Sequence, residues 1–233
     1  MASISPRFDT LPDDQQKLFY ELKQVPSDFV LYDGTAIALR IGHRESIDFD
    51  FFSKQPFNPD TLYNEISFLK DSKIIGKSKD TLTCDVKKSD YANGVKISFF
   101  GGLHLRQIVT PDHFPENNIK IASLKDLLGM KCATIQNRSQ KKDYIDIHAI
   151  LKHTDLSLYD GLAAAQTIYG EGFNPIITLK ALVFFDDGDL SDLSEKIKQD
   201  MNKEVSSVVM SKIPVLDPSK TKDIGDTDQG LGK

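Results

Sequence analysis

The segment Ser46–Phe52, with the sequence SIDFDFF, restricts the fold of this chain more than any other. Apolar and polar side chains alternate through it, and a period of two predicts a β-strand with one face in the core. Asp48 and Asp50 would share the opposite face, because alternate side chains of a strand point to the same side. We therefore expect a sheet from which two carboxylates project together. The positions expected in the core are Ile47, Phe49 and Phe51.

Two carboxylates this close repel each other unless something compensates their charge. A divalent cation is the simplest compensation, and hard oxygen ligands suit Mg²⁺ or Mn²⁺. The alternative is a solvated strand face on which Asp48 and Asp50 have no common task. Two acids separated by one residue are a weak motif when they stand alone.

A glycine turn lies shortly before this strand. Gly34 and Thr35 fall between an expected strand that ends at Tyr32 and an expected helix over Thr35–Arg40. Backbone N–H groups at a helix N-terminus bind anions, and glycine lets a phosphate approach closely. An anion site beside a pair of metal-binding acids would suit phosphoryl transfer, in which catalysis is mostly positioning and charge neutralisation.

The rest of the pattern divides the chain into an α+β core over 1–115 and a helical domain over 116–212 packed on it. Residues 213–233 have no aromatic residue and no period, so we expect a disordered tail. Ser123 is an expected helix cap, and Gly42 an expected helix end. Further expected helices cover 11–24, 60–69 and 142–152, and further expected strands cover 73–77, 81–87 and 95–100.

Composition limits the classes of protein that remain. The 233 residues carry a net charge of −5, which argues against binding nucleic acid by bulk charge. No apolar run approaches the ~20 residues that span a bilayer. The two cysteines, Cys84 and Cys132, cannot form a disulfide framework, so we expect reduced core residues in a cytoplasmic protein without membrane contact.

Two sequence blocks resemble the AbiEii/AbiGii toxin family of nucleotidyltransferases, in the DNA polymerase beta-like superfamily. The first is LYDGTAIALRIGHRESIDFDFF, which matches the family at Gly34, Thr35, Ala36, Gly42, His43, Arg44, Ser46, Asp48, Asp50, Phe51 and Phe52. The second is MKCATIQNRSQKKDYIDIHAIL, which matches at Lys131, Arg138, Lys142, Asp143 and Asp146. One position departs from the pattern: Asp33 stands where the family usually has glycine.

The resemblance implies a nucleotidyltransferase-type mixed sheet flanked by helices, followed by a helical C-terminal half. It implies that Asp48 and Asp50 hold one or two Mg²⁺ (or Mn²⁺) ions against a triphosphate. Lys131 would contact the triphosphate, and Asp143 would be a distal acid that acts as a base toward the acceptor. Asp146, one helical turn further on, would share the face of Asp143. Nucleotide binding would involve Gly34, Thr35, Arg44, Ser46, Arg138 and Lys142.

The implied reaction moves a nucleoside monophosphate from an NTP to an acceptor hydroxyl and releases pyrophosphate. The implied acceptor is RNA, especially a tRNA end, or a protein side chain, and a toxin of this kind would have a cognate antitoxin protein. Two alternatives remain at this stage: transfer to a small molecule, and a non-catalytic nucleotide-binding relative, for which Asp33 is the reason. The basic stretch 131–142 would meet a nucleotide, an RNA backbone or only water.

Overall fold

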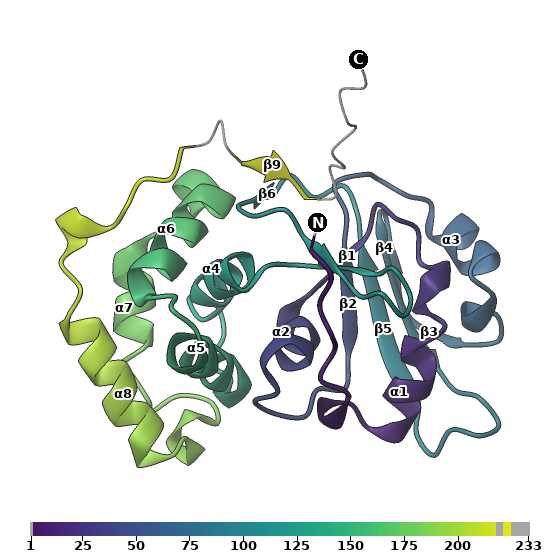
Figure 1. Ribbon diagram of the computed structural model, residues 1–233, viewed down its shortest axis with the longest axis horizontal. Coiled ribbons are helices and arrows are strands. Elements are labelled where there is room, and N and C mark those ends of the chain that lie inside the picture. Colours follow the sequence, from purple (N-terminus) through teal and green to yellow (C-terminus); the bar gives the residue numbers. More distant parts are fainter. Residues whose placement is uncertain (1, 218–220, 225–233) are drawn as a thin grey trace.

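The computed structural model describes residues 2–217 and 221–224. A mixed sheet of seven strands forms one side of the molecule and a group of helices forms the other (Figure 1). The strand order is β3-β4-β5-β2-β1-β8-β7. The strands are β1 (Val30–Tyr32), β2 (Phe49–Phe52), β3 (Lys73–Ser78), β4 (Thr81–Val86), β5 (Val95–Phe100), β7 (Asp112–His113) and β8 (Lys120–Ile121).

The centre of the sheet places Asp50 among neighbours from two other strands. β2 is antiparallel to β1 and pairs Asp50 with Tyr32. On its other side β2 is parallel to β5 and pairs Asp50 with Ser98. Phe49 and Phe51, the alternate residues of β2, are fully buried in the core, as their spacing predicts.

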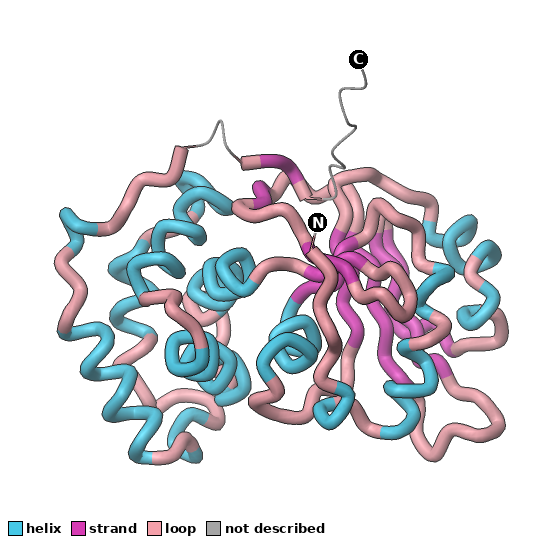
Figure 2. The backbone as a smooth tube through the Cα atoms, viewed as in Figure 1, coloured by secondary structure: helices cyan, strands magenta, loops and turns pink. Residues whose placement is uncertain are grey.

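Helices cover the sheet and continue beyond it (Figure 2). α2 lies between the sheet and α4 and α5, and it packs against both of these helices. The helices α6, α7 and α8 lie on the far side of α4 and α5 from the sheet (Figure 1). The α-helices are α1 (Asp13–Phe19), α2 (Asp33–Ile41), α3 (Pro59–Glu65), α4 (Leu124–Thr134), α5 (Lys141–His153), α6 (Leu158–Tyr169), α7 (Pro175–Ala181) and α8 (Glu195–Ser206).

The strand expected over Ser46–Phe52 begins three residues later than predicted, at Phe49. Ile47, which we expected in the core, is 54% exposed. The reason is a set of hydrogen bonds that holds the preceding residues as a loop. Gln15 donates to the Ile47 carbonyl at 3.1 Å, and the hydroxyl of Thr35 donates to the Asp48 carbonyl. These carbonyls therefore bond to side chains instead of to a neighbouring strand.

The ends of α2 and α4 follow local rules. Asp33 begins α2 with a φ of 58°, a left-handed value that aspartate tolerates better than most residues. Gly42 ends the same helix with a φ of 68°, as expected for a glycine C-cap. Ser123 caps α4 by accepting a hydrogen bond from the backbone N–H of Asp126.

The sheet continues past residue 115, where we placed the end of the α+β core, because β8 ends at Ile121. Part of the expected tail is also ordered. β9 (Lys222–Asp223) pairs with β6 (Arg106–Gln107), and Ile224 is fully buried. Hydrophobic burial of Ile224 explains why this segment packs against the rest of the protein. The other residues of the expected tail beyond 217 lie outside the described residues.

Two further predictions concern the whole chain. Cys84 and Cys132 are both buried free thiols, as expected. Within residues 2–217 and 221–224, no helix is both long and apolar enough to cross a membrane.

Candidate active site

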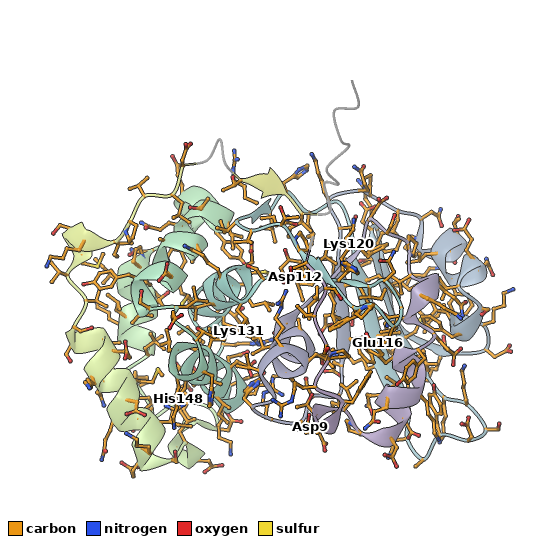
Figure 3. The ribbon with its side chains drawn as sticks, in the orientation of Figure 1. Asp9, Asp112, Glu116, Lys120, Lys131 and His148 are labelled. Carbon is orange, nitrogen blue, oxygen red and sulfur yellow. The ribbon has the colours of Figure 1, made fainter. Side chains whose placement is uncertain are left out.

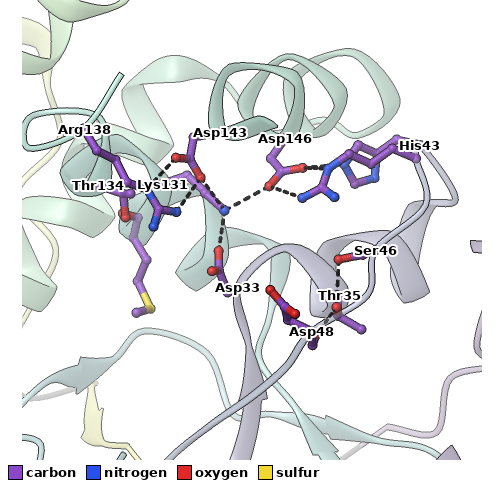
Figure 4. A network of polar contacts seen from close by, with 12 residues as sticks. Asp33, Thr35, His43, Ser46, Asp48, Lys131, Thr134, Arg138, Asp143 and Asp146 are labelled. Carbon is purple, nitrogen blue, oxygen red and sulfur yellow. Dashed lines mark hydrogen bonds and ion pairs between the residues drawn. The ribbon is translucent and has the colours of Figure 1, made fainter. Parts of the chain in front are cut away.

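A buried lysine joins the three helices that meet beside the sheet. Lys131, on α4, lies between the helical side and α2 (Figure 3), and its side chain is 3% exposed. Its Nζ atom lies 2.7 Å from Oδ1 of Asp143 and 2.9 Å from Oδ2 of Asp146, both on α5. It also forms an ion pair with Asp33 at the start of α2 (Figure 4). One ammonium group thus contacts three carboxylates.

Asp143 is surrounded by cations. Its side chain is fully buried, and besides Lys131 it accepts bonds from Arg138 Nε at 2.8 Å and Nη2 at 2.9 Å. Burial raises the pKa of the Asp143 carboxyl, but the bonds from Arg138 and Lys131 outweigh burial and hold the pKa below its usual value. A carboxylate in this state is a poor proton acceptor, which is contrary to the role of base implied by the resemblance.

Asp146 is held in the same way from the other side. Arg44 donates hydrogen bonds to both oxygens of its buried carboxylate, from Nε at 2.7 Å and from Nη2 at 3.0 Å. His43 Nε2 lies 2.7 Å from Oδ1. Against the effect of burial, the bonds from His43 and Arg44 and the charge of Lys131 lower the pKa of the Asp146 carboxyl well below its ordinary value. Asp143 and Asp146 do share one helix face, as predicted.

Oxygens of Asp33, Asp143 and Asp146 lie within 4.8 Å of one another, close enough to hold a metal ion. The ammonium of Lys131, however, bonds to all three carboxylates. A metal ion there would displace a buried lysine and leave its charge unpaired, which is costly. We therefore regard this cluster as complete with its own cation.

Asp48 and Asp50 line one cavity of about 340 Å³ together with Gly34 and Lys131. Both acids thus face the same space beside Gly34, as the sequence predicts, but Gly34 lies in the first turn of α2 and not in a separate turn before the helix, because α2 begins directly after β1, at Asp33. In the described part of the chain, the cation paired with the Asp48 carboxylate is Lys96, whose Nζ lies 3.3 Å away, and both side chains are partly exposed. Burial, helped by the charge of Asp33, raises the pKa of Asp50 to about 6, although Ser98 bonds to its carboxyl.

The balance of charge around this acidic cavity favours an added cation. Its wall carries the carboxylates of Asp33, Glu45, Asp48 and Asp50 against the cations of Arg44, Lys131 and Lys142. Arg44 and Lys131 are already bonded to buried acids, which leaves Lys142 as the exposed cation of the wall. Two oxygen-donating side chains with so little cationic compensation form a suitable donor set for Mg²⁺ or Mn²⁺.

Four of the expected nucleotide-binding side chains, those of Thr35, Arg44, Ser46 and Arg138, have partners within the protein. The Thr35 hydroxyl is buried and lies 2.8 Å from that of Ser46, so both help to hold the loop that carries Asp48. A side chain at Gly34 would collide with the guanidinium of Arg44, so glycine is needed there for the Arg44–Asp146 pair. Lys142 is exposed at the rim, where a ligand can reach it.

A second cavity, of about 310 Å³, adjoins the first and shares Asp33 and Lys131 with it. Arg138 lines this second cavity, while Asp143 is among the lining residues of neither. The sequence reasoning did not predict this apolar cavity, because its wall comes from strands, loops and helices far apart in the chain. Ser98 was not predicted as a site residue either. It is the strand neighbour of Asp50, and it shares a face of β5 with Lys96, two residues earlier.

Comparisons with known proteins give a family match and a curated relative. The sequence model of the nucleotidyl transferase AbiEii toxin family, from type IV toxin–antitoxin systems, matches residues 18–219. An uncharacterised protein from Aquifex aeolicus is 32% identical over 163 residues, which are 69% of this chain and 75% of that protein.

Solved structures share the fold. MenT4, a nucleotidyltransferase toxin from Mycobacterium tuberculosis, superposes with a TM-score of 0.55 and 12% identity over 85% of this chain and 83% of its own. A presumed nucleotidyltransferase from H. pylori superposes with a TM-score of 0.53 and 14% identity over 82% of this chain and 91% of its own. With its family match over most of its length, this chain belongs to the AbiEii family of nucleotidyltransferase toxins.

Proposed function

We propose that this protein transfers a nucleoside monophosphate from an NTP to an acceptor hydroxyl, with Mg²⁺ or Mn²⁺ held by Asp48 and Asp50. The observation that carries the proposal is the acidic cavity, in which these two carboxylates lie beside the start of α2 with little cationic compensation. A triphosphate would bring further negative charge, so it binds here only together with divalent cations.

The chain's own residues would then act in three ways. Asp48 and Asp50 bind the metal ions, which neutralise the phosphates and activate the acceptor hydroxyl when they are present. Lys142 attracts the phosphates from the exposed rim. Thr35 and Ser46 hold the Asp48 loop in place through the Thr35 hydroxyl.

The Lys131 cluster has a supporting role in this proposal. Asp143 and Asp146 fix Lys131 at the wall shared by both cavities, where Lys131 holds Asp33 in place beside the substrate. Asp143 positions Lys131 and Arg138 instead of taking a proton, because both of its oxygens already accept bonds. Arg138 lies at the mouth of the second cavity and can contact the nucleotide.

The acceptor hydroxyl belongs in this proposal to RNA, a tRNA end included, or to a protein side chain. Family membership supports a toxin whose activity a cognate antitoxin protein restrains. The reaction consumes NTPs, so we place it in the cytoplasm.

The test is transfer of label from each of the four α-³²P-labelled NTPs to total RNA and to total protein, with Mg²⁺ or Mn²⁺. We expect label in one macromolecular fraction, release of pyrophosphate, and loss of both on addition of EDTA. Asp48→Asn should abolish transfer. The matched control is Asp85→Asn on β4, because Asp85 is not among the residues that line either cavity. Transfer that persists in Asp48→Asn or in EDTA would overturn the proposal.

A further inference from the structure

The second cavity is hollow and mostly apolar, as small-molecule binding sites are. Most of its wall is apolar, and it touches the acidic cavity through Asp33 and Lys131. A ligand that fills it can therefore extend directly into the space where Asp48 and Asp50 lie. The apolar residues of the wall are Phe52, Phe100, Leu103, Leu105, Leu127, Met130 and Tyr169.

Aromatic rings form two sides of this cavity. Phe52 and Phe100 are paired neighbours on β2 and β5, and their rings pack edge to face with centroids 5.4 Å apart. Tyr32 stacks on Phe52 at 5.1 Å and fixes the position of that ring from within the sheet. Tyr169, at the end of α6, is a half-buried ring on the helical side. A flat ligand would lie among preorganised aromatic and aliphatic surfaces.

Four polar side chains of the wall, those of Asp33, Lys131, Thr134 and Arg138, are already bonded within the protein. The Thr134 hydroxyl donates to the Met130 carbonyl at 2.8 Å. Arg138 and Lys131 are both bonded to Asp143. The interior of the cavity thus favours a flat group with an apolar face, and two of its three charged lining residues, Asp33 and Lys131, also line the acidic cavity. A nucleobase attached to a polyphosphate has this distribution of polarity.

We propose that the apolar cavity takes the base of the nucleoside triphosphate, stacked against the aromatic wall of Phe52, Phe100 and Tyr169. The proposal rests on the proposed function, since the same ligand's triphosphate lies at Asp48 and Asp50. Stacking on aromatic side chains accepts every base, because every base has a π face. Purine and pyrimidine triphosphates therefore both depend on this wall.

The test compares two ligands by calorimetric titration in Mg²⁺: each NTP, and inorganic tripolyphosphate, which has the phosphates without a base. We expect Tyr169→Ala to weaken NTP binding by about tenfold, the effect of losing one stacking partner. Tripolyphosphate binding should not change. Gln166→Ala, an exposed position on the same helix, should leave both affinities unchanged. Asp50→Asn should weaken binding of both ligands.

A second variant tests the cavity without removing any wall. Leu103→Trp adds an indole to a half-buried loop position that lines the cavity. It should exclude the base and weaken NTP binding, again without changing tripolyphosphate binding, and it decides the question if Tyr169→Ala does not fold. The assignment of the base is overturned if either folded variant binds NTPs as well as the original chain does, or loses both ligands equally. If the unaltered protein binds neither ligand, it is the proposed function that fails.

Discussion

The molecule contains two pairs of aspartates that differ in almost every physical respect. The helix pair, Asp143 and Asp146, is fully buried and its pKa values are lowered. The strand pair, Asp48 and Asp50, lines an open cavity, and the pKa of Asp50 is raised to about 6. Burial acts in the same direction at Asp50, Asp143 and Asp146, so burial does not explain the difference.

The difference comes from the partners. The helix pair is matched by Lys131, Arg138 and Arg44, which the chain itself supplies. Within residues 2–217 and 221–224, the ion-pair partner of the strand pair is Lys96, and an ion pair between partly exposed groups contributes little. The protein completes one acidic site with its own cations, and in the function we propose the other site binds a cation from solution.

The largest expected effect is on the transfer rate at the strand pair, where a substitution should lower activity without lowering folding stability. Asp50→Asn should lower the transfer rate by about a thousandfold or more, because it removes a ligand of the metal ions on which charge neutralisation depends. It should not lower the folding stability, since the carboxyl it replaces is desolvated and repelled by Asp33 and Asp48. Initial rates and urea denaturation of the same preparation measure the two quantities. If the Asp50→Asn variant keeps its activity, the strand pair does not differ from the helix pair in the way proposed.

The helix pair should show the reverse order of effects. Asp143→Asn should lower the free energy of unfolding by about 3 kcal/mol, because it leaves the buried Lys131 and the Arg138 guanidinium short of a counter-charge. Urea denaturation measures this loss. Asp155→Asn, at a loop position after α5, is the control and should change stability by less than about 0.5 kcal/mol. If both changes have the same small effect, the cluster does not stabilise the fold.

The pH dependence of stability should differ in sign between the two pairs. The folded pKa of Asp50 is above its unfolded value, so this carboxyl favours folding below about pH 4 and loses that contribution as the pH rises through about 6. In EDTA above pH 7, Asp50→Asn should therefore be more stable than the original chain, by about 1–3 kcal/mol.

Asp146 should behave in the opposite way, because its folded pKa is lowered. Its contribution is present above about pH 4 and is lost as the pH falls through the folded value. Urea denaturation midpoints from pH 3 to 8, for the original chain and for Asp50→Asn, measure both trends. Curves for the two proteins that stay parallel over this range would contradict the assignment to Asp50.

The smallest expected effect concerns Asp33, which interacts with both aspartate pairs. It forms an ion pair with Lys131, the partner of the helix pair, and its charge raises the pKa of Asp50 in the strand pair. Asp33→Gly and Asp33→Ala both remove the carboxylate, but only glycine suits a φ of 58° without a steric cost. Asp33→Gly should therefore be more stable than Asp33→Ala by about 1 kcal/mol. Equal thermal midpoints for the two variants would show that the backbone at this position relaxes.

Local patterns in the sequence predicted much of the fold. The alternation at Phe49–Phe52, the cap at Ser123 and the glycine at Gly42 are short-range features, and each appears where it was expected. The position of Ile47 could not be predicted in this way, because hydrogen bonds from Gln15 and Thr35 override its alternation. The placement of Asp48 and Asp50 beside Gly34 could be predicted, since both segments adjoin short neighbouring strands.

The partners of the acids were harder to predict than the acids. Arg138 and Asp143 are five residues apart, and their pairing is local. Asp146 instead binds Arg44, 102 residues earlier in the chain, and this pairing depends on how α2 packs against α5. Without the partners, a pattern of acids does not distinguish a carboxylate held by internal cations from one that is open to a metal ion.

The short pairing of β9 with β6 has a consequence for the timing of folding. The backbone N–H of Ile224 donates to the carbonyl of Leu105, and Leu105 is part of the apolar wall. β6 and β9 lie far apart in the sequence, so their pairing closes a long loop, and the entropy of closing that loop is lost before the contact forms. We therefore expect the strand pair that supports the wall at Leu105 to form late in folding, after the more local contacts of the sheet and the helices.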